Sequence, residues 1–272
     1  MERRQIFAIL FALVCLSWAG QAQFVDNQER KLDCNGGGWR PDRAGFCEMR
    51  EFTMPAAVGQ LHVDGRMNGG VAVKGWNRNE VLVRAQVRGW GDTDAAARGI
   101  AQQVRVTAAG GQVGADGPGM DGRREWSVSY EIFAPHGTDL TLRAHNGGIA
   151  IADVTGKIDF ETTNGGVTLK RLAGAVHGRT TNGGLQVELA GSRWDGQGLD
   201  VQTTNGGVRL TAPDNYSARL ETGTVNGGVR VDFPIKVSGE VRHAISATLG
   251  SGGALIRLKT TNGGVLIGRG TV

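Results

Sequence analysis

The sequence predicts an all-β protein: a single-stranded β-solenoid, or β-helix, of stacked two-strand repeats about 18 residues long, with one inserted helix near the N-terminal end. The first observation behind this prediction is that Asn-Gly-Gly triplets recur at Asn68, Asn146, Asn164, Asn182, Asn205, Asn226 and Asn262. In the second half of the chain the spacings are 18, 18, 23, 21 and 36 residues, and the last is twice the first. Four triplets belong to the longer motif Thr-Thr-Asn-Gly-Gly.

The second observation is that polarity alternates on both sides of each triplet. Every second residue before the asparagine is mostly apolar or threonine, as in Ile158, Phe160 and Thr162. The third and fifth residues after it are apolar, as in Val167 and Leu169. The positions between them are mostly polar or charged. A period of two is that of a strand with one buried and one exposed face, so each repeat is predicted to hold two short strands.

Two architectures fit a chain that bends at each Asn-Gly-Gly triplet, and we call these bends corners. In a solenoid, identical corners stack, and the glycines supply the positive φ of the bend. The asparagine amides can then hydrogen-bond up the column; this structural ladder would contain Asn146, Asn164, Asn182, Asn205, Asn226 and Asn262. In the alternative, an antiparallel β-meander or sandwich, Asn-Gly is a type I′ hairpin turn. A hairpin needs only Asn-Gly, whereas Thr-Thr and the second glycine also recur here, which favours the solenoid.

Residues 1–22 are predicted to be a cleaved signal peptide. Arg3 and Arg4 precede an apolar run over residues 6–19, and Ala22 completes the small-residue pattern of a cleavage site. The run is shorter than a comfortable membrane span, and no later stretch approaches membrane length. The mature protein is therefore expected to be exported, either periplasmic or at the cell surface or outside the cell, with no transmembrane segment after cleavage.

Residues 23–47 are predicted to form an N-terminal segment stapled by a disulfide between Cys34 and Cys47. These two cysteines remain after signal cleavage, and exported proteins mature in an oxidising compartment. Closing the loop would stabilise the fold by about 3 kcal/mol on the chain-entropy model. The net charge of +4 is mild, and the Lys and Arg residues form no run, so no nucleic-acid partner is expected.

Residues 48–137 are predicted to cap one end of the stack, and residues 138–272 to form the repeats. The capping segment should contain strands at 81–88, 104–108 and 126–133. A helix is expected over 93–103, because Asp92 can cap it and apolar residues lie along one side. Repeat proteins need such covers because an open end exposes unpaired strand edges and core.

Several of these motifs together resemble those of a known family. The recurring "NGGV" and "TTNGG", the segment "GWNRNEVLVRA" followed by a helix, and the exported N-terminus are similar to the bacterial "putative adhesin" β-strand-repeat family, a domain of unknown function. The resemblance covers residues 48–272. It implies an NGG-repeat β-solenoid in the cell envelope and an adhesin-like role, and it supplies no catalytic residues.

The chain is expected to be non-enzymatic and to need no cofactor or metal. Its five histidines lack metal-ligand spacing, and no nucleophile elbow or phosphate loop is present. Because β-helices also occur as polysaccharide lyases and hydrolases, paired outward carboxylates are the competing signal. The candidate pairs are Asp159 with Glu161, and Glu188 with Asp200. A polysaccharide-active enzyme is thus the alternative function.

Two features of the outer surface could bind an envelope glycan or a protein partner. The first is an outward column of threonines, which can match a regular surface: Thr163, Thr181, Thr204 and Thr261. The second is the insertion at 191–198, which displays Arg193, Trp194 and Asp195, with Tyr216 on the same corner one unit later. Aromatic and arginine side chains on a rigidly held loop are typical of recognition sites. Trp194 can equally fold back over the core.

Overall fold

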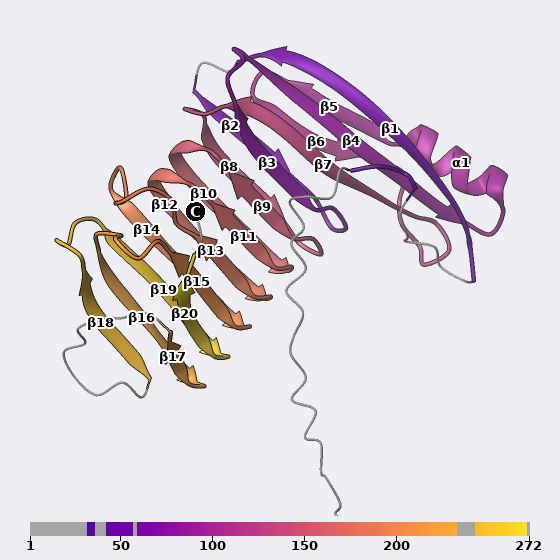
Figure 1. Ribbon diagram of the computed structural model, residues 1–272. Coiled ribbons are helices and arrows are strands. Elements are labelled where there is room, and N and C mark those ends of the chain that lie inside the picture. Colours follow the sequence, from indigo (N-terminus) through magenta and orange to yellow (C-terminus); the bar gives the residue numbers. More distant parts are fainter. Residues whose placement is uncertain (1–31, 36–41, 57–58, 233–242, 271–272) are drawn as a thin grey trace, which may run out of the picture.

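The computed structural model describes residues 32–35, 42–56, 59–232 and 243–270 (Figure 1). The predicted signal peptide, residues 1–22, lies outside the described residues. The described chain forms two sheets of ten strands each and one helix. The prediction of an all-β chain with one helix is therefore confirmed. One apolar core is shared by strands of both sheets.

The strands follow one another in space in an order that differs from the chain order. The first sheet contains, in spatial order, β1 (Ala44–Pro55), β4 (Glu80–Gly91), β7 (Glu125–Pro135), β3 (Val71–Trp76), β9 (Ile149–Ala152), β11 (Val167–Lys170), β13 (Leu185–Glu188), β15 (Val208–Ala212), β20 (Val265–Arg269) and β17 (Val229–Val231). The second contains β18 (Ala244–Leu249), β16 (Ala218–Asn226), β19 (Leu255–Asn262), β14 (Gly198–Asn205), β12 (Ala173–Asn182), β10 (Thr155–Asn164), β8 (Asp139–Ala144), β2 (Gln60–Asp64), β6 (Gln112–Asp116) and β5 (Arg105–Ala109).

Each repeat contributes one strand to each sheet, and neighbouring repeats pair in parallel. β10 and β12 align Asn164 with Asn182, and β11 and β13 align Val167 with Leu185. Within the described part of the repeat region, antiparallel pairing is confined to β16 with β18. The antiparallel meander, the predicted alternative, is therefore wrong for the repeats.

The last repeat of the chain does not stack last. β19 and β20, yellow in Figure 1, lie between the β14–β15 repeat and the β16–β17 repeat. Asn262 consequently aligns with Asn205 on one side and with Asn226 on the other. A single-stranded solenoid winds in chain order, and the chain departs from that order here.

The Thr-Thr-Asn-Gly-Gly motif makes the contact between neighbouring repeats. The first threonine is buried, and its hydroxyl donates a hydrogen bond to a glycine carbonyl of the adjacent repeat, as from Thr162 to Gly147 (2.7 Å) and from Thr180 to Gly165 (2.8 Å). The asparagine side chains form a ladder in which each amide donates to the next amide oxygen at 2.7–3.0 Å. Its spatial order is Asn68, Asn146, Asn164, Asn182, Asn205, Asn262 and Asn226.

The glycines of the triplets are required by close approach rather than by positive φ. All seven triplets lie within the described residues, and the only one of their glycines with a positive φ is Gly263, at 158°. A Cβ on Gly165 would lie 2.2 Å from the Gly147 carbonyl oxygen, and one on Gly183 would lie 2.1 Å from that of Gly165. The predicted role in the bend is therefore wrong: no side chain fits between corners stacked at strand spacing.

The N-terminal third of the described chain extends both sheets. β7, β4 and β1 continue the first sheet as antiparallel neighbours, and β6 and β5 continue the second. The helix α1 (Asp94–Gln103) packs against β4 and β1. Its N-cap is Thr93, whose hydroxyl accepts from the Ala96 amide at 3.2 Å, rather than the predicted Asp92. Cys47 on β1 is joined to Cys34 in a disulfide.

An acid-sensitive ion pair links two corners of the stack. Arg171 Nε and Nη2 donate to the Asp153 carboxylate at 2.6 and 2.9 Å, and this hydrogen bonding lowers the pKa of Asp153. A lowered folded-state pKa contributes stability above the unfolded value of about 3.9 and loses it as the pH falls. We expect Asp153→Asn to flatten the fall in Tm between about pH 5 and pH 2.

The control for this prediction is Asp159→Asn, since Asp159 forms no hydrogen bond or ion pair with the other described residues. Tm measured against pH should keep the wild-type slope in this variant. Equal slopes for both variants would contradict the assignment.

Candidate functional site

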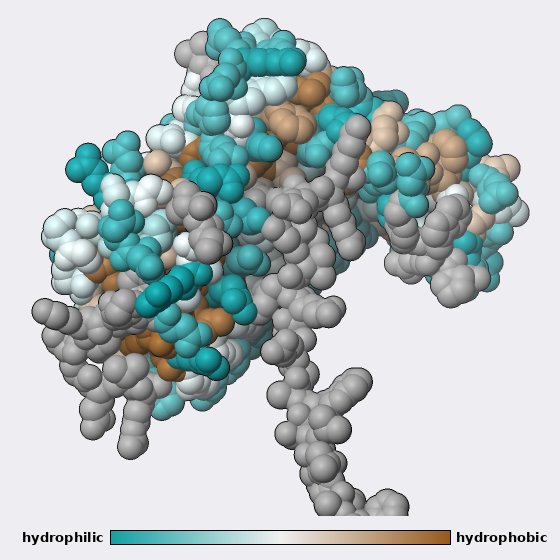
Figure 2. Space-filling view, in the orientation of Figure 1, coloured by the Kyte–Doolittle hydropathy of each residue, from teal (hydrophilic) through white to brown (hydrophobic). Residues whose placement is uncertain are grey.

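The described residues contain neither a group of three or more His, Cys, Asp and Glu side chains that could hold a metal ion nor a helix that could cross a membrane. On the face seen in Figure 2, hydrophilic side chains are interspersed with apolar ones. On the outer faces of the two sheets, the repeat register aligns outward side chains in rows, and these rows are the candidate sites considered below.

A shallow polar groove of about 410 Å³ lies on the outer face of the second sheet, across β8, β10, β12 and β14. We call it the sheet-B groove, and its lining residues are Arg143, Asp159, Phe160, Glu161, His177, Gly178, Arg179, Asp200 and Gln202. Parallel pairing places Asp159, His177 and Asp200 side by side on adjacent strands. Because adjacent strands lie about 4.8 Å apart, the imidazole stands between two carboxylates.

The charged groups of the sheet-B groove are only partly paired with one another. Arg179 Nη2 lies 2.6 Å from Glu161 Oε1, and Arg143 Nε lies 3.8 Å from Glu161 Oε2. His177 is exposed and, like Asp159, has no hydrogen bond or ion pair with the rest of the described chain. The groove thus presents an acceptor and an imidazole beside a fixed ion pair.

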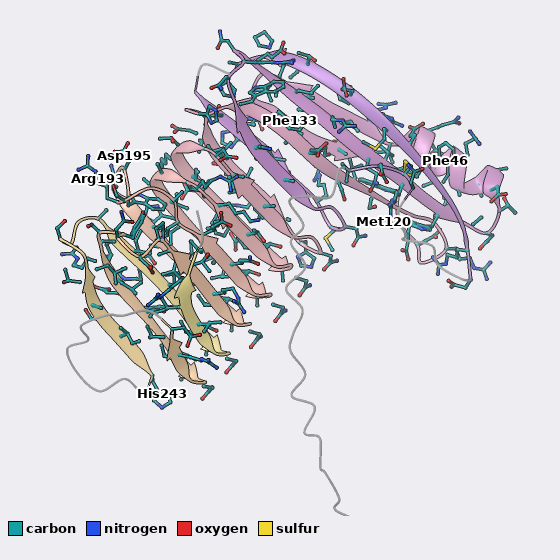
Figure 3. All side chains as sticks on the ribbon, viewed as in Figure 1. Phe46, Met120, Phe133, Arg193, Asp195 and His243 are labelled. Atoms are coloured by element: carbon teal, nitrogen blue, oxygen red, sulfur yellow. A yellow bond between two sulfur atoms is a disulfide. The ribbon has the colours of Figure 1, made fainter. Side chains whose placement is uncertain are left out.

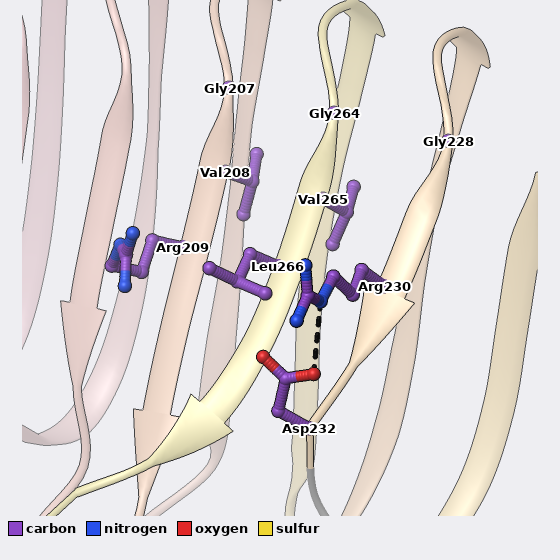
Figure 4. A pocket seen from close by; sticks show the side chains of 9 residues that line it. All are labelled: Gly207, Val208, Arg209, Gly228, Arg230, Asp232, Gly264, Val265 and Leu266. Carbon is purple, nitrogen blue, oxygen red and sulfur yellow. Dashed lines mark hydrogen bonds and ion pairs between the residues drawn. The ribbon is translucent and has the colours of Figure 1, made fainter. Parts of the chain in front are cut away.

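A second groove, of about 540 Å³, lies on the outer face of the first sheet at the C-terminal end of the stack (Figure 4). It is lined by Gly207, Val208, Arg209, Gly228, Arg230, Asp232, Gly264, Val265 and Leu266. Leu266 projects between the two arginine-bearing strands, and Arg230 Nε donates to Asp232 Oδ1 at 3.0 Å. Since its polar groups are mainly this ion pair, it offers fewer free hydrogen-bonding groups than the sheet-B groove.

The predicted aromatic contacts are not on the surface. Trp194 is 5% exposed, and its indole Nε1 donates to the Gly174 carbonyl at 3.0 Å. Tyr216 is 2% exposed, and burial raises its pKa to about 12. Of the two possibilities for Trp194, the structure has the one in which the side chain folds back over the core, and the predicted surface position of Tyr216 is wrong because its ring is also buried there. Arg193 and Asp195 remain exposed at this corner (Figure 3).

The predicted threonines do lie in one outward column. The register places Thr163, Thr181, Thr204 and Thr261 on consecutive strands, and Val225, 66% exposed, follows them. Thr163 is half-buried and the other threonines are exposed. The column is a regular hydroxyl-bearing edge beside the asparagine ladder.

The predicted carboxylate pairs are only partly brought together. Asp159 and Glu161 share the outer face of β10 and both line the sheet-B groove. Glu188 lies on β13 in the other sheet, where its carboxylate pairs with Arg171 at 3.3 Å. Its predicted pairing with Asp200 is therefore wrong, since the two residues belong to different sheets.

Sequence reasoning missed the cross-strand rows that build the groove. Arg143, Glu161, Arg179 and Gln202 each stand three residues before the asparagine of their own repeat, and Asp159, His177 and Asp200 each stand five before. Aligning the repeats on their asparagines would have revealed both rows, because the ladder holds the asparagines in register.

Comparison with known proteins identifies the family of this chain. The family described as Toastrack DUF4097 matches residues 48–267. No curated protein matches the chain. A "putative cell adhesion protein" from Clostridium sporogenes ATCC 15579 is 8% identical, with a TM-score of 0.46, over 82% of this chain and 100% of that one. A "putative adhesin" from Bacteroides fragilis NCTC 9343 is 9% identical, with a TM-score of 0.30, over 82% and 97%. Because the family match spans well over half of the sequence, this chain belongs to the Toastrack DUF4097 family.

Proposed function

We propose that this protein is an exported, non-enzymatic, adhesin-like or envelope-associated interaction protein that binds through the outer surface of its β-solenoid-like stack. Its contact site is the sheet-B groove, and its ligand is a hydroxyl-rich envelope glycan. The observation that carries the proposal is that Asp159 and His177, whose side chains pair with no other described residue, lie beside the Glu161–Arg179 ion pair. Carboxylates accept hydrogen bonds from sugar hydroxyl groups, and guanidinium groups donate hydrogen bonds to the oxygen atoms of those hydroxyls.

The parallel strands beneath the groove support this role. Asp159, His177 and Asp200 project from strands whose backbones are hydrogen-bonded on both sides, so their spacing is set before a ligand arrives. A preorganised site loses less conformational entropy on binding than a mobile one. A chain of hydroxyl-bearing units could follow the same row across several strands.

Two features support export. The Cys34–Cys47 disulfide is compatible with an oxidising compartment. The predicted signal peptide would direct the chain there. Both features support an exported protein whose groove would meet envelope polysaccharides.

The alternative is a polysaccharide-active enzyme, and the carboxylates beside His177 are the feature that favours it. A glycosidase needs one carboxyl group as proton donor and a second as base or nucleophile. In this groove Glu161 is bonded to Arg179 and Asp200 to Arg257. The groove is also a shallow depression in a sheet surface, whereas catalysis gains from enclosure that excludes water. Binding without turnover is therefore the better-supported function.

We expect the mature chain, from Gln23 onward, to be retained on insoluble peptidoglycan or envelope polysaccharide without releasing reducing ends. Losing a hydrogen bond to a charged group costs about 1.5–3 kcal/mol, so Asp159→Asn and His177→Ala should each weaken retention about tenfold or more. The matched control is Arg230→Ala on the opposite sheet, which should bind like the wild type. Reducing ends in the supernatant would establish the enzyme instead. Absence of retention on every polysaccharide would refute the glycan ligand and direct the search to protein partners.

A further inference from the structure

The C-terminal repeat, residues 255–269, occupies a slot between two other repeats. We define the slot by its walls, the β14–β15 repeat and the β16–β17 repeat. The Asn262 side chain donates to Asn205 and accepts from Asn226, both at 2.7 Å. The backbone is bonded on both sides as well: Gly206 N donates to Asn262 O at 2.9 Å, and Gly263 N donates to Asn226 O at 3.0 Å. The repeat therefore completes two strand edges at once.

Arg257 is the side chain that fits this slot. Its Nη1 lies 3.0 Å from Asp200 on one wall, and its Nη2 lies 2.9 Å from Glu221 on the other. The register aligns Asp200, Arg257 and Glu221 in one row. If the repeats stacked in chain order, the two carboxylates would stand directly opposite each other, and like charges in that position are destabilising. The slot thus has a carboxylate on each wall, and an inserted repeat with arginine at this position neutralises both.

The C-terminal repeat is joined to the rest of the chain by a short glycine-rich connection. Residues 250–254 lead from β18 to β19, which lie on opposite sides of β16. Gly250, Gly252 and Gly253 have positive φ values of 51°, 80° and 135°. Glycine adopts other backbone conformations at little cost, so this connection can open without straining side chains.

We propose that the slot is also a self-association site, filled by the C-terminal repeat of a second copy of this chain. All the contacts described above are the same whichever chain supplies residues 255–269, so the choice depends on effective concentration and on the contacts of the connection, where Ser251 N donates to Ser217 Oγ at 3.2 Å. A short connection gives an effective concentration of the order of millimolar, which favours the chain's own repeat in dilute solution. A connection too short to turn would prevent the repeat from reaching the slot of its own chain. Two chains would then exchange their C-terminal repeats and form a dimer.

Deleting Ser251, Gly252 and Gly253 tests this directly. The path from Leu249 to Leu255 must cross β16, a distance of about 10 Å, and must also reverse direction. After the deletion three Cα steps remain, which span at most about 11 Å when fully extended and leave no length for the reversal. We expect this variant to have about twice the molar mass of the wild type in light scattering and to retain its β-sheet circular dichroism. A folded monomer would overturn the proposal.

A cross-linking experiment with the intact connection covers the case in which the deletion prevents folding. One preparation carries Gln202→Cys and the other Lys259→Cys; both residues are exposed and face each other across β14 and β19. After incubation together at high concentration, an intermolecular disulfide should form between them. The matched control replaces the second partner with Thr248→Cys, an exposed position on β18 that pairs with β16.

The aligned side chains of Asp200, Arg257 and Glu221 allow a second test of the same cross-link. Adding Arg257→Glu to the Lys259→Cys chain would place three carboxylates in one row, and the cross-link should be lost. Cross-linking that does not exceed the Thr248→Cys control, or that survives Arg257→Glu, would refute exchange through the slot.

Discussion

Gly165→Ala should strongly destabilise the repeat stack, whereas Gly166→Ala, one residue later, should not destabilise it. A Cβ on Gly165 would lie 2.2 Å from the carbonyl oxygen of Gly147, which lies just before β9, a strand that is paired on both sides. The strands would have to separate to admit a methyl group. We expect a loss of about 3 kcal/mol or more in the free energy of unfolding, measured by urea denaturation.

Gly166 is the matched control because a Cβ there would meet its nearest atom, the Gly184 oxygen, at 3.6 Å, an ordinary contact. Replacing such a glycine with alanine reduces the entropy of the unfolded chain and can stabilise by about 0.4–1 kcal/mol. If the two substitutions change the free energy of unfolding in opposite directions, the close spacing between corners is the reason for glycine at position 165. If both substitutions destabilised equally, a requirement for glycine's backbone freedom would be the better explanation.

Gly178→Ala should destabilise the stack through one neighbour, the ring of Phe160. Both residues occupy inward positions on paired strands, and a Cβ on Gly178 would lie 2.4 Å from two ring carbons. Phe160 is 2% exposed and packed in the core, so the ring has little room to move. We expect Gly178→Ala to cost about 2–3 kcal/mol as an overpacking substitution, and Phe160→Ala about 3–5 kcal/mol as a cavity.

The two substitutions together should cost less than their sum. Removing the ring leaves the space that the new methyl group needs, so the double-mutant cycle should give a coupling of about 2 kcal/mol. Gly268→Ala provides the control, since a Cβ there meets no atom within 4 Å. Combined with Phe160→Ala, it should be additive within about 0.5 kcal/mol. An additive result for Gly178→Ala would mean that another contact limits this position.

Local patterns explain how much of the fold could be predicted. Alternation around Ile158, Phe160 and Val167 predicted inward faces that are buried as expected. The helix was predicted within one residue, although Thr93 rather than Asp92 caps it. β1, β6 and β18 were missed. The predicted boundary at residue 47 cut through β1, and β6 follows a tight turn at Gly110–Gly111.

The site was less predictable than the fold because it is made by contacts between repeats. His177 is an ordinary outward histidine in sequence, and it becomes part of a groove only when Asp159 and Asp200 align beside it. Trp194 illustrates the converse: exposed and buried positions were equally compatible with its insertion, and the Gly174 carbonyl provides the hydrogen bond that holds it inside. Single-strand patterns contain neither kind of information.

The sequence by itself determined the strand class, the inward faces and the corner residues, since each depends on a period of two or on one repeated motif. Only the tertiary structure decided the order of the repeats. Every Asn-Gly-Gly corner offers nearly the same hydrogen bonds to its neighbours, so backbone pairing does not distinguish one order from another. In its place between two others, the β19–β20 repeat brings Arg257 against both Asp200 and Glu221, residues far apart in the chain that meet only in the folded stack.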